Sequence, residues 1–210
     1  YVVPSAPGKR ADGDEKVTDL LYTCHALAAA GEYFSAPFAR IQARFAEIAQ
    51  SLSLPDWWRA ELDAIRARIP LEKTPDYAAS RGEYLCGRLL AAYLGWDFVD
   101  AADVILFGQD GRLDAEGTNQ ACAARLAHHE YAVIPGFYGR LPDGRVHTFS
   151  RGGSDVTGAI VARAVMASLY ENWTDVPGFL MADPRIVENP RLINSLTYRE
   201  LRELSYMGAS

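Results

Sequence analysis

Apolar residues recur every three to four positions through much of the first hundred residues, a spacing that predicts amphipathic helices. Over residues 35–52 the spacing places on one helix face Phe38, Ile41, Phe45 and Ile48. The same signal predicts three further helices, over residues 18–30, 55–68 and 75–94. Thr18 or Asp19 is expected to cap the first of these helices, and Gly31 to end it. Residues 18–94 are therefore expected to form a mostly helical subregion.

The pattern changes after Gly95, where short β-prone runs alternate with helical ones. Besides a β-prone start at residues 1–3, strands are expected over residues 97–99, 104–107 and 131–135. Helices are expected over residues 118–128 and through the apolar run 156–169. Strands that alternate with helices indicate an α/β fold, in which helices cover the faces of a sheet. No sharp boundary interrupts the chain, so one domain over residues 1–210 is expected.

Two local signals refine the second half of the chain. Asp143-Gly144 separates the β-prone segments 138–141 and 146–149, and this dipeptide predicts a hairpin turn. Thr197 lies three residues before Glu200, a capping box that predicts a last helix.

Composition limits the classes of function. The 210 residues are 49% hydrophobic and 23% charged, which is typical of a globular protein. The net charge of −6 opposes an extended surface for phosphate backbones, so a nucleic-acid partner is not expected. No apolar run approaches the roughly 20 residues of a membrane helix. Cys24, Cys86 and Cys122 are odd in number and widely spaced, which favours buried thiols in a reducing cytoplasm.

The segment 151–155, Arg-Gly-Gly-Ser-Asp, carries the clearest chemical signal. Its two glycines allow the backbone to pass close to a ligand. Ser154 or Asp155 is expected to cap the helix that follows, whose first N–H groups favour an anion. A tight turn before a capped helix would explain the same residues without a ligand. Residues 172–178 are expected to run from a strand end into a turn.

Five short motifs occur in a fixed order along the chain. They are Ser80-Arg81-Gly82-Glu83, Pro135-Gly136-Phe137-Tyr138-Gly139, Arg151-Gly152-Gly153-Ser154-Asp155, Thr174-Asp175-Val176-Pro177-Gly178 and Asp183-Pro184-Arg185. Together with the segment 198–209, they resemble the aspartokinases of the amino-acid kinase family. The resemblance implies a three-layer α/β sandwich, with a mainly parallel sheet flanked by helices and a helical insertion in the first half. Residues 31–74 match no motif.

The resemblance implies transfer of the γ-phosphate of ATP to the side-chain carboxylate of L-aspartate. The product, 4-phospho-L-aspartate, opens lysine, threonine and methionine biosynthesis. A carboxylate with an ordinary pKa of about 3.9 is ionised at neutral pH, so the nucleophile needs no general base. Cations and precise positioning must instead overcome repulsion between the carboxylate and the triphosphate. Mg²⁺ is expected to be bound by the ATP phosphates and by water molecules, with no metal ligands from the protein.

The resemblance also assigns roles to individual residues. Arg151 would bind the substrate carboxylate, which a planar guanidinium can grip through two hydrogen bonds, and Glu83 would bind the ammonium group. Ser154 would lie beside the reacting groups, and Asp155 would orient a catalytic lysine. The remaining substrate residues would be Ser5, Thr18 and Phe137. A long charged loop between Ser5 and Thr18 departs from the family pattern.

The nucleotide would lie against Thr174, Asp175 and Arg185. A tyrosine of the family pattern is replaced by Leu180. The family's Lys-Phe-Gly-Gly-Ser stretch and its ACT-type regulatory domains are expected outside these residues, so the 210 residues alone are expected to be inactive. The full-length protein is expected to be a cytoplasmic homo-oligomer. The alternatives are a glutamate or acetylglutamate kinase, or a non-catalytic module that binds aspartate or a nucleotide.

Overall fold

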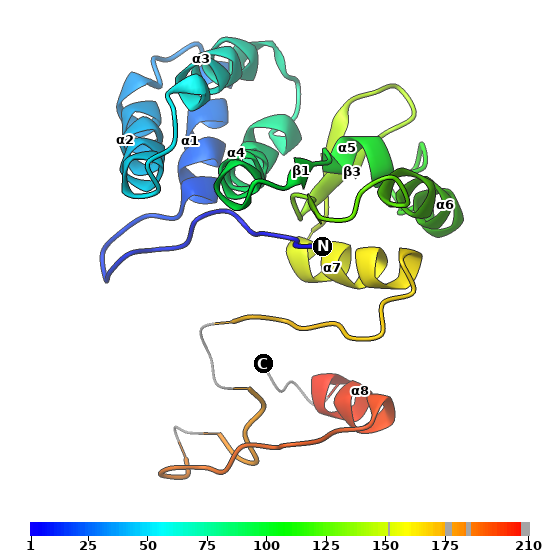
Figure 1. Ribbon diagram of the computed structural model, residues 1–210. Helices are drawn as coiled ribbons and strands as arrows, with labels where there is room; N and C mark the ends of the chain where they lie inside the picture. The colour runs from blue at the N-terminus through cyan, green and yellow to red at the C-terminus, as the bar shows by residue number, and fades with distance from the viewer. Residues whose placement is uncertain (151, 175–177, 184–185, 207–210) are drawn as a thin grey trace. The chain divides into compact units, whose positions relative to one another are not determined.

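The computed structural model describes residues 1–150, 152–174, 178–183 and 186–206 (Figure 1). The chain forms two compact units, Tyr1–Tyr170 and Glu171–Ser210. Among the described helices, none is both long enough and apolar enough to cross a bilayer.

The first half of the larger unit is helical, as the apolar spacing predicts. Its elements are α1 (Val17–Ala29), α2 (Ser35–Ser51), α3 (Trp57–Arg68), the short 3₁₀ turn η1 (Ile69–Leu71) and α4 (Asp76–Leu94). Helix α1 packs against both α2 and α4 (Figure 1). The shared core between these helices includes Leu21, Phe38, Ile41, Phe45 and Leu62, all fully buried. The four predicted helices are therefore confirmed to within a few residues.

The predicted cap of α1 is wrong. The helix begins at Val17, Lys16 occupies the N-cap position, and no side chain caps the end. Val17 is buried in the helical core, so its burial draws the first turn one residue further toward the N-terminus. Thr18 consequently lies inside the helix, with a half-buried side chain.

Three segments lie side by side in the small parallel sheet. Strand β1 (Asp97–Phe98) pairs with β2 (Ala132–Val133), and Val2 forms a parallel bridge to Val133 on β2. The Val2 N–H donates to the carbonyl of Ala132 at 3.0 Å, which ties the start of the chain to this sheet. The parallel pairing agrees with the expected α/β class, although the sheet of the described residues is short.

The predicted hairpin is present. Strand β3 (Tyr138–Arg140) pairs antiparallel with β4 (Val146–Thr148), and Gly144 in the turn has a φ of +86°. Glycine tolerates this left-handed conformation because it lacks a Cβ.

The strand predicted over residues 104–107 is mostly wrong. Helix α5 (Ala101–Val104) includes the first residue of the predicted strand. The Asp100 side chain caps this helix by accepting the Ala102 N–H at 2.9 Å. Within this predicted strand, only Leu106 and Phe107 form β-bridges, to Arg140 and Leu113 respectively. Helix α6 (Ala115–Leu126) begins before the predicted Thr118, because Asp114 caps it.

Two further elements complete the described chain. Helix α7 (Gly153–Ala164) ends before the predicted apolar run does, and residues 172–174 are not in a strand. In the smaller unit, the capping box is confirmed at the start of α8 (Tyr198–Tyr206). The Thr197 N–H donates to Glu200 Oε2 at 2.8 Å, and the Glu200 N–H donates to Thr197 Oγ1 at 3.3 Å.

Truncation of the helical core should cost far more stability than truncation of its surface. Phe45→Ala removes a fully buried ring of α2 from the helical core, and we expect a loss of about 3–5 kcal/mol of unfolding free energy. Tyr33→Ala is the control, because Tyr33 is 96% exposed, and it should change stability by less than about 0.5 kcal/mol. Urea denaturation of both variants measures the difference, and equal losses would contradict the assigned core.

Candidate functional site

Helix α4 approaches the start of the chain so closely that a side chain at Gly82 does not fit. A Cβ at Gly82 would lie 2.8 Å from the Cβ of Ala6 and 3.5 Å from Cγ1 of Val17. Because Gly82, Ala6 and Val17 lie this close together, the residues next to them in the chain also lie in one region. Glu83, Ser5 and Thr18 are therefore supplied to one region by α4, the N-terminal segment and α1.

A second close contact joins the N-terminal segment to α7. The Gly136 N–H donates to the carbonyl of Pro4 at 3.1 Å. A Cβ at Gly136 would lie 2.6 Å from both Cα and Oγ of Ser154, in the first turn of α7. Only a glycine allows this approach. Gly136 therefore contacts both Pro4 and Ser154, and the residues that follow Pro4 and Gly136 in the chain are Ser5 and Phe137. We define the candidate substrate site as these three residues, Ser5, Phe137 and Ser154, together with Glu83 and Thr18.

Glu83 is the most perturbed acid of this region. The residue is only 6% exposed, and its Oε2 has no hydrogen-bond partner among the described residues. Burial raises the pKa of Glu83 to about 7, opposed by the backbone N–H groups of Glu83 and Ala6 and by the charge of Arg81. A buried carboxylate oxygen without a partner is costly, so it favours a ligand that donates hydrogen bonds or carries positive charge.

Arg81, two residues earlier on α4, is buried too, but it is fully surrounded. Its guanidinium carbon lies over the rings of Tyr77, Tyr84 and Tyr138, at 4.7, 4.4 and 5.1 Å from their centroids. Its Nε and Nη2 donate to Oγ of Ser80 at 3.1 and 3.0 Å. These rings stabilise the cation through their π faces.

The sequence motif contains Arg81 but gave it no role. Tyr77 and Tyr84 lie four residues before it and three after it, a helical spacing that could have indicated the stacking. Tyr138 could not have been found in this way. It comes from β3, where burial raises the pKa of its hydroxyl well above the usual range, and that hydroxyl donates to Asp100 Oδ1 at 2.7 Å.

The predicted cap of α7 is wrong. Neither Ser154 nor Asp155 caps the helix; Gly152, with a φ of +56°, occupies the N-cap position without a side-chain cap bond. Ser154 is half-buried and Asp155 is exposed, both within the first turn. The backbone N–H groups of this turn favour an anion beside Gly136.

The other half of the predicted site is not assembled by the described residues. Arg151, Asp175 and Arg185 lie outside the described part of the chain. Thr174 is exposed in the smaller unit. The nucleotide assignments therefore stay predictions.

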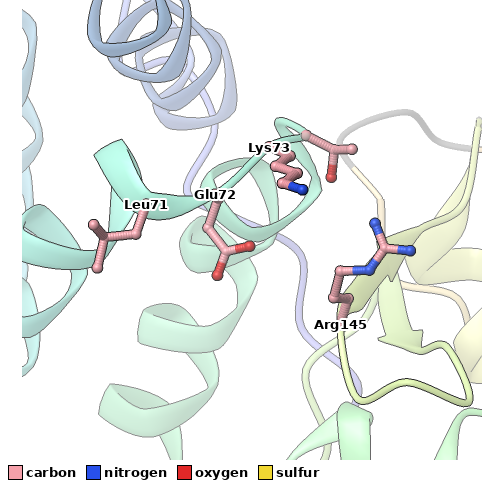
Figure 2. A pocket seen from close by; sticks show the side chains of 5 residues that line it. Leu71, Glu72, Lys73 and Arg145 are labelled. Carbon is pink, nitrogen blue, oxygen red and sulfur yellow. The ribbon is translucent and has the colours of Figure 1, made fainter.

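No group of three or more His, Cys, Asp or Glu side chains in the described ranges is arranged to hold a metal ion. A separate cavity of about 360 Å³ is lined by Leu71, Glu72, Lys73, Thr74 and Arg145. Figure 2 shows Lys73 and Arg145 extending toward the same opening, from the loop before α4 and from the β3–β4 hairpin. None of the predicted site residues that the structure describes lines this cavity.

Comparison with known proteins gives consistent relatives. A profile of the Amino acid kinase family matches residues 1–210. Aspartokinase 3 of Bacillus subtilis is 38% identical over 231 residues, which cover 100% of this chain and 49% of the relative. The chain thus spans about half the length of this curated relative.

Two solved structures extend the comparison. The crystal structure of Clostridium acetobutylicum aspartate kinase superimposes with a TM-score of 0.93 at 51% identity, over 98% of this chain and 48% of that one. Escherichia coli aspartokinase III, solved in complex with aspartate and ADP, gives a TM-score of 0.78 at 30% identity. This match covers 99% of this chain and 49% of that one.

Replacement of Glu83 by glutamine should stabilise the protein at high pH. The pKa of Glu83 in the folded state, about 7, lies above its ordinary value of 4.5. Between these pH values the folded protein binds a proton that the unfolded chain has lost, so stability from this group falls as the pH rises. Glu83→Gln removes this penalty and should gain up to about 3 kcal/mol at pH 8, with little change at pH 4.5.

Thermal unfolding at pH 4.5 and pH 8 measures the effect. Glu130→Gln is the matched control, because Glu130 is exposed, and it should show no pH-dependent gain. A Glu83→Gln variant that is less stable than the wild type at pH 8 would show that the carboxylate has a stabilising partner.

Proposed function

Because this chain belongs to the amino acid kinase family, we propose that its full-length protein phosphorylates the side-chain carboxylate of L-aspartate with ATP, giving 4-phospho-L-aspartate. The similarity to aspartate kinases along the whole chain supports this substrate. The observation that carries the proposal is the buried carboxylate of Glu83, where the N-terminal segment, α1 and α4 meet. One of its oxygens has no hydrogen-bond partner among the described residues.

Glu83 is suited to the ammonium group of a free amino acid. An ammonium ion supplies both the hydrogen bonds and the charge that a desolvated carboxylate requires. N-acetylglutamate carries a neutral amide at that position and would leave the negative charge of Glu83 uncompensated. This difference favours aspartate or glutamate over acetylated substrates. Glutamate is the remaining alternative, since it differs from aspartate by one methylene.

The chemistry requires little from the protein beyond positioning and charge. The substrate carboxylate is ionised and can attack the γ-phosphorus directly, so the chain must bring two anions together. We propose that Arg151 binds the α-carboxylate and that Ser154 contacts the reacting groups from the first turn of α7. Phe137, Ser5 and Thr18 would line the substrate, and Asp155 would orient the lysine that the family pattern places upstream.

The nucleotide is proposed to lie against Thr174, Asp175 and Arg185, on the resemblance of their motifs. Mg²⁺ is proposed to accompany the ATP phosphates and to take its remaining ligands from water, as this ion commonly does at phosphate-transfer sites. There it would neutralise charge on the transferring phosphoryl group. Homo-oligomeric assembly, a cytoplasmic location and a place in lysine and threonine biosynthesis belong to the same proposal.

Trapping of the acyl phosphate with hydroxylamine tests the function in the full-length protein. With MgATP, we expect hydroxamate from L-aspartate and at least tenfold lower kcat/KM for L-glutamate and N-acetylglutamate. Aspartate that binds without hydroxamate formation would support the non-catalytic module instead. Preference for glutamate would replace the proposed substrate.

Variants of the two proposed charge contacts test the site. Arg151→Ala should cost about 2–5 kcal/mol in kcat/KM for aspartate, as expected when one partner of a desolvated charge pair is removed. Glu83→Gln should lower the same quantity at least tenfold while the KM for ATP stays within threefold. Glu130→Gln is the control. A collapse of ATP binding with an unchanged aspartate KM would overturn both assignments.

A further inference from the structure

Phe137, one of the residues of the candidate substrate site, has a strained backbone conformation. Its φ is +78°, in the left-handed region that bulky L-residues rarely adopt. Such a conformation persists only where the surrounding structure holds it, and it is often associated with ligand sites. The strain therefore raises the question of which contacts fix this peptide.

Two glycines allow the conformation by leaving room around it. A Cβ at Gly153 would lie 2.7 Å from Cδ2 and 2.8 Å from Cα of Phe137. A Cβ at Gly136 would collide with Ser154, 2.6 Å from its Cα. The peptide before β3 is therefore pressed directly against the first turn of α7.

One buried hydroxyl connects these two segments. Thr157 Oγ1 accepts the N–H of Phe137 at 3.2 Å and donates to the carbonyl of Gly153 at 2.8 Å. Thr157 is 0% exposed, so water does not compete for these bonds. The carbonyl of Phe137 in turn accepts the N–H of Phe149 at 2.9 Å, which fixes the other side of the same residue.

We propose that Thr157 is a positioning residue for the substrate site. Its hydroxyl holds the strained Phe137 peptide in register with the first turn of α7. The register sets where Phe137 and Ser154 lie relative to each other, and both are proposed substrate contacts. We call the two hydrogen bonds of Thr157, to the Phe137 N–H and the Gly153 carbonyl, the clamp. The expected effect on aspartate binding rests on the proposed function, whereas the stability of the clamp can be measured without any substrate.

A hydroxyl clamp differs from ordinary core packing in what its loss should change. Without the acceptor on Thr157, the half-buried Phe137 residue loses a backbone hydrogen bond that helps to offset its strain, and the peptide can relax toward a more common φ. The substrate contacts then shift, although the core volume is unchanged. Thr157→Val removes the hydroxyl at nearly constant shape, whereas Thr157→Ser keeps it.

Thr118 on α6 is a close internal control. Its Oγ1 also accepts a backbone N–H from another segment, that of Leu106 at 2.9 Å, and donates to the Leu106 carbonyl at 3.2 Å. It is likewise 0% exposed. Its partner Leu106 is not one of the proposed site residues. Thr118→Val therefore removes an equivalent buried hydroxyl outside the clamp.

Steady-state kinetics of the full-length protein test the effect on substrate. Thr157→Val should raise the aspartate KM at least tenfold with the ATP KM within threefold, and Thr157→Ser should stay within threefold of the wild type for both. Thr118→Val should lower the melting temperature as Thr157→Val does, with an aspartate KM within twofold of the wild type. If the two valine variants behave alike, or if Thr157→Val loses only stability, the proposal is overturned.

Amide hydrogen exchange separates the clamp from the proposed function. Thr157→Val should accelerate exchange at least tenfold in segments 136–139 and 153–157, with Thr157→Ser close to the wild type. Unchanged exchange would overturn the clamp even if aspartate is the substrate. Accelerated exchange in a protein that does not phosphorylate aspartate would retain the clamp and reject the function. If Thr157→Val does not fold, the comparison of Thr157→Ser with Thr157→Ala replaces it.

Discussion

The candidate site depends on backbone segments that approach one another too closely for any side chain. Gly82 lies against Ala6, and Gly136 lies against Ser154, at distances that a Cβ would violate. The parallel bridge from Val2 to β2 fixes the register that lets the Pro4 carbonyl accept the Gly136 N–H. These contacts are steric, so they tolerate little change. They deliver polar side chains from four separate elements to one region.

Helix α4 carries two buried residues of opposite charge, Arg81 and Glu83, whose surroundings differ. Arg81 is enclosed by three tyrosine rings and donates twice to Ser80. Glu83 has one oxygen with no partner in the described part of the chain, and burial raises its pKa to about 7. A core selected for stability alone would not retain such a carboxylate, because burial of an unpaired charge opposes folding. The difference separates a residue that supports the site from one that is open to a ligand.

The strained Phe137 peptide fits the same division between support and function. Its conformation is held by Thr157, Phe149 and the space left by Gly153, while its side chain remains half-buried at the site. Residues that hold a strained segment do not need to touch a substrate in order to affect its binding. The described residues of the proposed substrate site are consequently positioned by contacts within the chain itself.

The sequence by itself determined the helices of the first hundred residues, the β3–β4 hairpin and the family resemblance, because periodicity, turn residues and ordered motifs are local properties. It also selected Glu83 through its motif. It failed over residues 104–107 and at the start of α7, where Asp100 caps a helix and Gly152 takes a left-handed φ. The tertiary structure alone decided the pKa of Glu83, the Tyr138 ring against Arg81 and the clamp on Phe137. Each of these depends on partners distant in the chain, whose proximity no local pattern encodes.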